Sequence, residues 1–453
     1  MTGPLPSGRP AAGRAASSGE WVAALFLAYV LLQRFAVPGT PISLLLPVTG
    51  LWIVAGLRAG VVAVDRTRWM LWLAALASTA VVSVLGSMLG RMPIASLSSW
   101  GLLLVSWAPL VFIVARVDRF EYLTLLRRVS TICAGLAVLA LATTATQAVG
   151  LGYVDVLGEI APHGLLLDTF NTNSPISYGE SVVKANGWIG LEPSLVSLEL
   201  GAGLLAALLS RRPWWVSTLI LAGMIATLSG SGVVLVLVGL VAVLFSRLRP
   251  TAVKLLGPAA VVVVVLLVSP AGSTFLDRAG EFSEPGSSGS IRGVEPYEAL
   301  VPMWTAHLDG MLLGFGPGSS QTIINAPGVA GLIVPVPAKV FFDYGLIAGL
   351  VLAFFMISCH LRSPSRSLAL ALFVAYWSIQ PAATLMLLIG QIGIFSAFWA
   401  PATDVLEDRR PVEVPAPRRP ARTPVRPVAH AGVGPAGVGP AGAGRAGGGR
   451  HAR

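Results

Sequence analysis

The sequence predicts an all-α polytopic membrane protein with about twelve transmembrane helices, two long loops outside the membrane and a disordered C-terminal tail. Of its 453 residues, 55% are hydrophobic and only 11% are charged, whereas a soluble chain carries about 25% charged residues. Uncharged apolar stretches of roughly 20 residues recur along the chain, and each is long enough to cross a bilayer as a helix. Basic residues gather on one predicted side of the membrane. A soluble enzyme is therefore excluded.

The elements follow in order along the chain. Residues 1–20 are rich in Gly, Pro, Ala and Ser, which predicts a flexible cytoplasmic leader. A transmembrane domain is expected over 21–402. We place breaks at 229–232 and at Gln380-Pro381, because the uncharged runs there are too long for one helix and turn residues interrupt them. The candidate spans are 21–36, 42–63, 69–89, 98–115, 129–151, 194–210, 214–229, 232–246, 255–269, 338–360, 367–383 and 385–402.

The charge distribution gives the orientation. With both termini in the cytoplasm, 25 of the 31 Lys and Arg residues lie on the inner side, together with eight acidic residues, for a net charge of +17. The outer side holds six basic and thirteen acidic residues, for a net charge of −7. Short cytoplasmic loops carry such an excess of basic residues. The net charge of +10 therefore indicates topology and not nucleic-acid binding, and we expect a multi-pass protein of the plasma membrane with both termini in the cytoplasm.

The two outer loops, 152–193 and 270–337, are long, whereas every inner connection is short. The polar chemistry of the protein is therefore expected on the outer side. The tail, 403–453, is rich in Pro and Arg and then runs through Gly-Pro-Ala-Gly-Val units that cannot bury a core. We expect it to be disordered, with its arginines near anionic lipid headgroups.

Missing motifs narrow the possible chemistry. The sequence has no P-loop, no His-Glu-x-x-His, no Asp-x-Asp pair and no Cys/His cluster, so neither a metal nor another cofactor is expected. Cys133 and Cys359 lie in apolar stretches, as small buried residues do. Glu199 is the main carboxylate inside a predicted span, and ion-driven transporters normally need several such groups.

The first outer loop ends in a run from Lys184 to Ser194 that enters the sixth span. A cation and a carboxylate, Lys184 and Glu192, stand at the mouth of this helix and are suited to an anionic headgroup and a sugar hydroxyl. The alternative for Glu192 is a helix cap before Pro193, which the helix dipole favours. The alternative for Lys184 is a solvated loop position.

The second outer loop carries Arg278, Arg292, Trp304 and a Gly-Phe-Gly-Pro-Gly run that includes Gly316 and Gly318. Arginine offers a planar, permanently charged fork that grips phosphate oxygens in pairs, which suits a lipid-linked pyrophosphate. The alternative for Arg292 is a salt bridge to Glu295 or Glu298. His307 is more typical of a structural histidine, and Asp343 either serves chemistry or favours the dipole of the tenth span.

Taken in order, these pieces resemble the bacterial O-antigen ligase and Wzy polysaccharide polymerase superfamily. The resemblance covers roughly residues 184–350 and the twelve-helix layout. Its motifs are Lys184 to Ser194 with a Gly-x-Glu-Pro-Ser ending, Thr227 to Gly232, Ser287 to Arg292, Trp304 with Leu313 to Gly318, and Asp343-Tyr344-Gly345-Leu346.

The resemblance implies a metal-independent glycosyltransferase of the GT-C type that uses a polyprenyl-pyrophosphate-linked oligosaccharide outside the membrane. By this resemblance, Arg292 and Lys184 bind the pyrophosphate, with Lys184 standing where the family has arginine, and Arg278 is a further candidate. Glu192 or Asp343 is then the general base for the acceptor hydroxyl. Ligases of the superfamily carry a His-Asn pair where this chain reads Pro337-Ala338-Lys339-Val340. Polymerase-like transfer is therefore favoured over ligase-like transfer, with a flippase and a chain-length regulator as expected partners.

Two further interpretations stay open at the level of sequence. The many spans and Glu199 also fit a transporter or flippase that moves a lipid-linked or small anionic solute. The missing histidine also fits an inactive relative that acts as a scaffold. Membrane lipid surrounds the protein under each interpretation.

Overall fold

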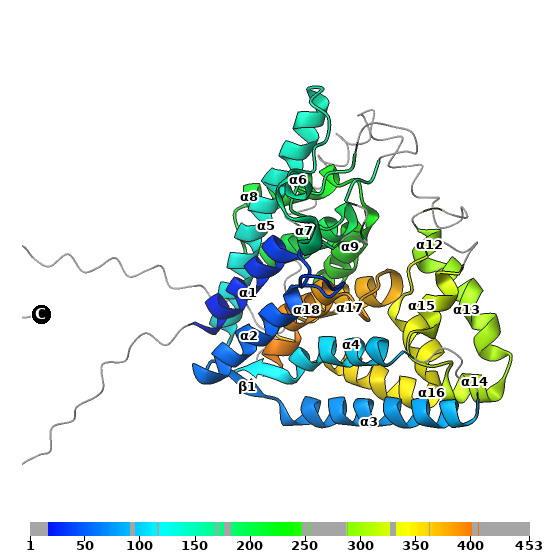
Figure 1. The fold of residues 1–453 in the computed structure, drawn as a ribbon. Coiled ribbons are helices and arrows are strands. Elements are labelled where there is room, and N and C mark those ends of the chain that lie inside the picture. Colours follow the sequence, from blue (N-terminus) through cyan, green and yellow to red (C-terminus); the bar gives the residue numbers. More distant parts are fainter. Residues whose placement is uncertain are drawn as a thin grey trace, which may run out of the picture. The chain divides into compact units, whose positions relative to one another are not determined.

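The computed structural model describes residues 17–90, 96–115, 117–167, 170, 172–175, 183–246, 253, 287, 289–326, 332–361, 363–400 and 406. These residues are mostly helical (Figure 1). Within them, a helix lies at each of the predicted spans except 255–269, which is outside the described residues together with Arg278 and nearly all of the tail. The helices at the predicted spans are α1 (Ser18–Leu32), α2 (Leu45–Arg58), α3 (Arg66–Met88), α4 (Leu97–Trp107), α5 (Arg119–Ala148), α7 (Pro193–Leu209), α8 (Trp214–Ala226), α9 (Gly230–Leu244), α16 (Val336–Ser358), α17 (Arg366–Ile379) and α18 (Met386–Phe395).

Three of the described helices, α3, α5 and α16, are long and apolar enough to cross a membrane. Seven others are apolar but shorter, at 10–17 residues. The chain is thus an integral membrane protein of the helical kind, whereas a total of twelve crossings stays a prediction. The breaks predicted at 229–232 and at Gln380-Pro381 are confirmed, because α9 begins at Gly230 and α17 ends at Ile379.

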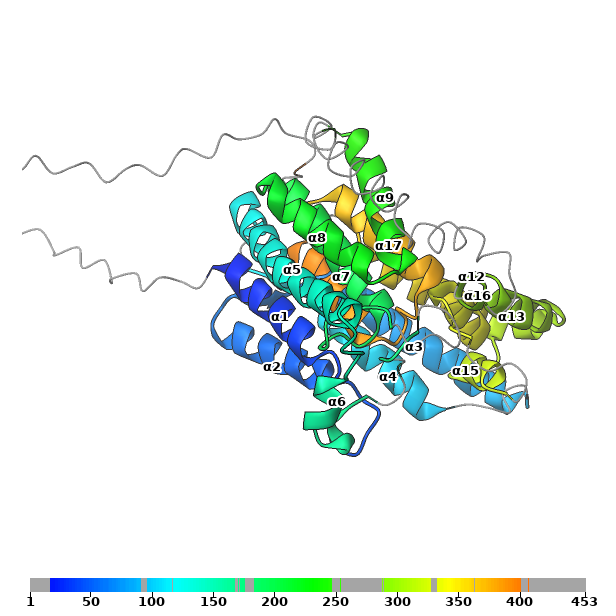
Figure 2. The ribbon, with the colours of Figure 1, turned by 90° about the horizontal axis from the view of Figure 1, so that it is seen from above.

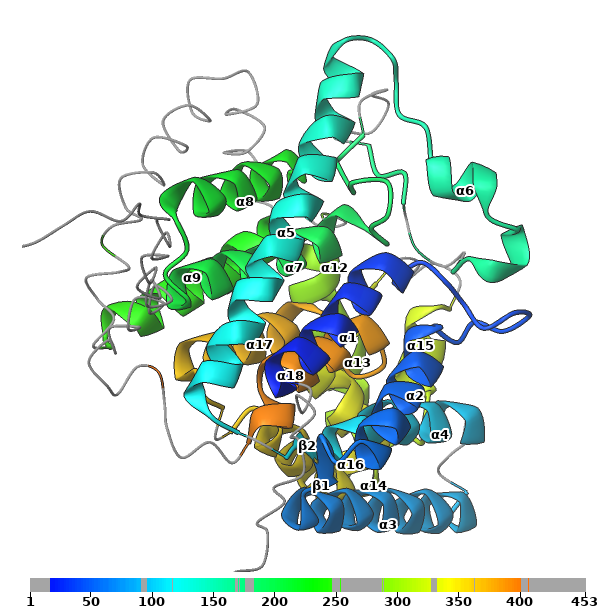
Figure 3. The same ribbon diagram turned by 90° about the vertical axis from the view of Figure 1, so that its left-hand side faces the viewer.

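Helix α7 lies at the centre of the packing, in contact with α5, α8 and α9. Every residue of α7 except Ser194 is buried. Figure 2 shows α8, α5, α1 and α2 as successive neighbours, and Figure 3 shows α3 along the bottom of the view, where it packs against α16. The polar residues at the start of α7 are therefore held by an almost wholly buried helix.

Glycine permits the close contact of α7 with α9. A Cβ atom at Gly232 would lie 2.1 Å from the carbonyl oxygen of Ser197. The Ser197 hydroxyl instead donates to the Ser229 carbonyl at 3.1 Å and accepts from the Gly232 amide at 3.1 Å. The Ser229 to Gly232 run is thereby fixed against α7.

Two predicted spans are interrupted by strands, so the expectation of a purely helical chain was wrong in detail. The segment predicted at 42–63 ends as helix at Arg58 and continues into β1 (Val62–Val64). The segment at 98–115 passes from α4 into the 3-10 helix η1 (Ala108–Val111) and then β2 (Phe112–Val114), which pairs antiparallel with β1. Pro109 lacks the N–H that would continue α4.

The stretch from Glu295 to Leu313 consists of two helices, α13 (Glu295–Thr305) and α14 (Leu308–Leu313). They stand between α12 (Ser290–Gly293) and α15 (Ser319–Ile324) in the second predicted outer loop. This segment has a small apolar core of its own, which also packs on the start of α16. Short helices α6 (Val156–Ile160) and η2 (His163–Leu165) belong to the first predicted outer loop, and η4 (Ala397–Trp399) follows α18.

Helix α16 is broken inside the predicted span 338–360. Gly345 has φ +65° and ψ −174°, which lies outside the helical region. The carbonyls of Phe342 and Asp343 instead accept hydrogen bonds from the amides of Phe315 and Gly316, at 2.9 and 3.0 Å. The Gly-Phe-Gly-Pro-Gly run therefore supplies the partners that the broken helix lacks.

Candidate functional site

Glu192 marks the start of α7. Its backbone is extended (φ −145°, ψ 153°) and Pro193 takes the first helical position, so the predicted cap position is confirmed. Its side chain, however, makes no capping hydrogen bond to the helix. The carboxylate accepts from the Ser194 hydroxyl at 3.0 Å and pairs with Nη2 of Arg292 at 3.6 Å.

Arg292 comes from α12 in the other predicted outer loop. The sequence suggested Glu295 or Glu298 as its partner, and the structure shows an ion pair with Glu192, which joins residues a hundred positions apart. Nη1 of Arg292 also donates to Oε1 of Gln380 at 3.3 Å. The side chains of Arg292 and Glu192 are 13% and 19% exposed. Both charges are thus mostly buried but remain accessible from outside the protein.

Gln380 and Ser231 complete this group. Gln380 follows α17 with extended backbone and is 1% exposed. Its Nε2 donates to the Ser231 hydroxyl at 3.1 Å. The group of Glu192, Arg292, Gln380 and Ser231, which we call the arginine cluster, unites four segments. Sequence reasoning used Gln380 only as a helix break and missed this contact.

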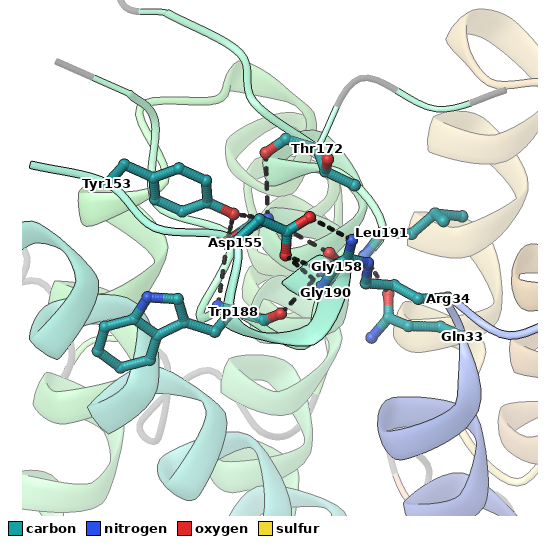
Figure 4. A network of polar contacts seen from close by, with 10 residues as sticks. Gln33, Arg34, Tyr153, Asp155, Gly158, Thr172, Trp188, Gly190 and Leu191 are labelled. Atoms are coloured by element: carbon teal, nitrogen blue, oxygen red, sulfur yellow. Dashed lines mark hydrogen bonds and ion pairs between the residues drawn. The ribbon is translucent and has the colours of Figure 1, made fainter. Parts of the chain in front are cut away.

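The loop that leads into Glu192 is held by Asn186, which is fully buried. Its Nδ2 donates to the Thr172 carbonyl at 3.1 Å and to the Tyr153 hydroxyl at 3.0 Å, and its Oδ1 accepts from the Trp188 amide at 3.0 Å (Figure 4). Burial raises the pKa of Tyr153. The Lys184 to Ser194 run is therefore a fixed turn rather than an open loop.

An ion pair that sequence reasoning missed lies beside this turn. Arg34, which is 4% exposed, donates from both Nη atoms to the two carboxylate oxygens of Asp155, at 2.6 Å each (Figure 4). It also donates to the Trp188 carbonyl at 3.1 Å. The Arg34 guanidinium holds the pKa of Asp155 below its ordinary value. Opposite charges on neighbouring outer segments were the available signal.

Asp343 lies in a different setting. It is fully buried on α16 and accepts four hydrogen bonds, from the Gly318 amide (3.1 Å), the Ser319 hydroxyl (3.1 Å), the Ser320 amide (2.8 Å) and Nζ of Lys339 (3.1 Å). Gly316 and Gly318 belong to the loop that this carboxylate holds. The i, i+4 spacing of Lys339 and Asp343 was a signal for their pairing.

The remaining predicted residues are separate from these hydrogen bonds. Lys184 is half-buried, and its amide donates to the Ser174 carbonyl at 2.9 Å. The ring of Trp304 lies 6.3 Å from that of Phe341, and its indole N–H is buried and has no hydrogen-bond partner among the described residues. Arg278 lies outside the described residues. The structure thus brings Glu192 and Arg292 together and places Asp343 among other partners.

The chemistry open to the arginine cluster is ionic and acid–base. Across the residues described, no three His, Cys, Asp or Glu side chains are grouped so as to hold a metal ion. The cluster offers one guanidinium for an anion, one carboxylate that can take a proton, and one amide and one hydroxyl for hydrogen bonds.

Comparison with known proteins identifies the family. No curated protein and no solved structure matches the chain with significant similarity. The profile of one family, described as WcaD colanic acid polymerase, matches residues 21–329, which is more than half of the chain. The match includes Glu192, Ser231 and Arg292. The chain belongs to this family of Wzy-like polysaccharide polymerases, as the motifs suggested.

Proposed function

We propose that this protein polymerises a surface or exopolysaccharide by transferring a polyprenyl-pyrophosphate-linked glycan to a hydroxyl of a second glycan on the outer side of the plasma membrane. The observation that carries the proposal is the ion pair of Arg292 with Glu192, assembled from both outer loops and backed by Gln380 and Ser231. Family membership supports a lipid-linked oligosaccharide as the substrate.

In this proposal Arg292 binds the pyrophosphate and stabilises the negative charge that develops on it as the sugar leaves. A guanidinium stays protonated at any physiological pH and matches two phosphate oxygens at once. Lys184 and Arg278 are further cations for the same group. Trp304 offers an aromatic face to the donor, and Gly316 and Gly318 permit close backbone approach.

Glu192 is the better candidate for the general base. A base must reach the proton that it removes. Glu192 is 19% exposed next to Arg292, whereas all four hydrogen bonds of the buried Asp343 serve its own helix and loop. We therefore assign proton abstraction to Glu192 and the support of the Gly316–Gly318 loop to Asp343.

The orientation of the protein is part of the proposal, with both termini in the cytoplasm and the arginine cluster outside. Exposed tryptophans support it, since tryptophan favours the membrane–water interface. Trp214 and Trp215 are 70% and 55% exposed at the start of α8, directly after Arg211 and Arg212 in a predicted inner loop. A flippase and a chain-length regulator would act before and alongside this step.

The proposal is tested by Arg292→Ala in the producing cell. Loss of one group that stabilises transition-state charge costs about 100-fold or more in rate, so polymer should fall to trace levels. Single repeat units on their lipid carrier should accumulate outside the membrane. Arg127→Ala, an exposed arginine on the predicted inner side, is the matched control. Normal polymer at normal protein levels would refute the role of Arg292.

Gene deletion separates the alternatives. Lipid-linked single units that accumulate outside the membrane, as measured by mass spectrometry, support a polymerase. Units that accumulate inside would indicate a flippase. Unchanged lipid-linked units would indicate a scaffold, and loss of transfer to a lipid acceptor would indicate ligase-like transfer, which is the second candidate reaction.

A further inference from the structure

The ion pair of Glu192 with Arg292 is built so that it can open. The two groups are 3.6 Å apart, and both side chains are partly exposed. At 3.6 Å the two charged groups are too far apart for a hydrogen bond, so the pair lacks the stronger attraction of a hydrogen-bonded ion pair. The pair is therefore easily exchanged for a stronger partner.

Each member of the pair also has an anchor of its own. Arg292 donates to Gln380, and Gln380 donates to Ser231. Glu192 accepts from the Ser194 hydroxyl and stands at the first turn of the buried helix α7. If the pair opens, the guanidinium and the carboxylate both keep a hydrogen-bond partner and their place in the site.

A pyrophosphate competes strongly for the guanidinium. It carries more negative charge than one carboxylate and offers oxygens that an arginine fork binds in pairs. A carboxylate that loses its cationic neighbour binds a proton more readily. One anion that binds Arg292 would thus both occupy the guanidinium and release Glu192.

We propose that Glu192 occupies the pyrophosphate position on Arg292 in the empty protein, and that the donor pyrophosphate displaces it and so activates it as the base. This inference rests on the proposed function. The released Glu192 carboxylate takes the proton of the acceptor hydroxyl, whose oxygen forms a bond to the anomeric carbon of the donor. The bond from that carbon to the pyrophosphate oxygen breaks, and its electron pair leaves with the polyprenyl pyrophosphate on Arg292.

Gln380 acts in this scheme as a positioning residue. It is nearly fully buried, and extended backbone before Pro381 carries it away from the end of α17. Its amide holds Nη1 of Arg292 while Nη2 changes partners. The exchange therefore needs no movement of α12.

The test is a binding measurement on the full-length protein in lipid nanodiscs, with undecaprenyl pyrophosphate as the probe. Glu192→Gln keeps the size of the side chain and removes the competing charge. It should bind the probe about two- to fivefold more tightly than the natural protein, which is the range expected for a partly exposed ion pair, and it should not polymerise. Glu159→Gln, an exposed outer-loop carboxylate, should bind like the natural protein.

Two more variants keep the outcomes apart. Arg292→Ala should bind at least tenfold more weakly, and adding Glu192→Gln to it should give no gain. Weakened binding by Arg292→Ala together with unchanged or weaker binding by Glu192→Gln overturns the displacement and leaves the proposed function intact. Unchanged binding by Arg292→Ala overturns the proposed function itself. Glu192→Ala repeats the measurement if Glu192→Gln is poorly folded, because Glu192 makes no capping bond to α7.

Discussion

Glu192 and Asp343 are both carboxylates near a cation on the predicted outer side, and their surroundings differ in every other respect. Glu192 is 19% exposed and has one charged partner at 3.6 Å and one hydroxyl at 3.0 Å. Asp343 is fully buried and accepts four hydrogen bonds between 2.8 and 3.1 Å.

The difference indicates a chemical role for Glu192 and a structural role for Asp343. A buried carboxylate that accepts several hydrogen bonds loses much free energy if it exchanges these partners for others. A carboxylate in a long, partly exposed ion pair loses little free energy when it changes partner. Asp343 therefore holds a loop to a helix, and Glu192 is free to change partners.

The sharpest test of this contrast is Asp343→Asn. The change leaves Lys339 buried without its counter-charge and turns an amide N–H toward groups that donate. Loss of one member of a buried pair costs about 3–5 kcal/mol, so the unfolding midpoint in detergent should fall steeply. Glu192→Gln should leave the midpoint nearly unchanged. A stable Asp343→Asn protein without polymerase activity would instead make Asp343 the catalytic group.

Gly345→Ala should have the next largest effect, because it disturbs the break in α16 against which the Gly-Phe-Gly-Pro-Gly run packs. The new Cβ would lie 2.3 Å from the carbonyl oxygen of Leu312, and the positive φ of this residue disfavours a side chain. We expect a loss of about 2–3 kcal/mol, measured as the same unfolding midpoint. Gly135→Ala in α5 is the control, since its Cβ would meet open space. Equal midpoints for the two variants would show that the break in α16 is dispensable.

The smallest effect is expected at Asp155. Its folded-state pKa is lowered by Arg34, so this pair stabilises the fold above the unfolded pKa of about 3.9 and stops doing so as pH falls through the lower folded value. Asp155→Asn should reduce the difference in melting temperature between pH 7 and acid conditions. The melting temperature at pH 7 should fall only slightly, because Asp155 is partly solvated. An identical pH profile for both proteins would contradict this account.

Much of the fold could be predicted because long uncharged apolar stretches of the sequence indicate where the helices lie. Ser-Gly-Ser-Gly and Gln-Pro gave the right breaks at 230 and 380, since those residues break helices by local chemistry. The break at Gly345 could not be found in this way. A single glycine in an apolar run is compatible with a helix, and here the partners of the broken turn come from residues 315 and 316.

The sequence indicates which charged residues belong to the site better than it indicates which of them contact each other. Glu192 and Arg292 stood out as charges in outer loops, and short-range spacing pointed Arg292 to Glu295 or Glu298. The pairing with Glu192 depends on how α12 meets the start of α7, which only tertiary packing decides. Gln380 carries no charge and occurs in no motif, so composition gave no reason to select it.

The break in α16 also bears on how the protein is made. The segment Val336–Ser358 contains an 18-residue window of mean hydropathy 2.2, so an insertion machinery meets it as one ordinary hydrophobic stretch. Inside lipid, the unpaired carbonyls of a broken helix have no water to bond to. The break in α16 is therefore stable only together with the hydrogen bonds from the amides of Phe315 and Gly316. The final shape of α16 thus depends on the docking of that loop as well as on the insertion of its own segment.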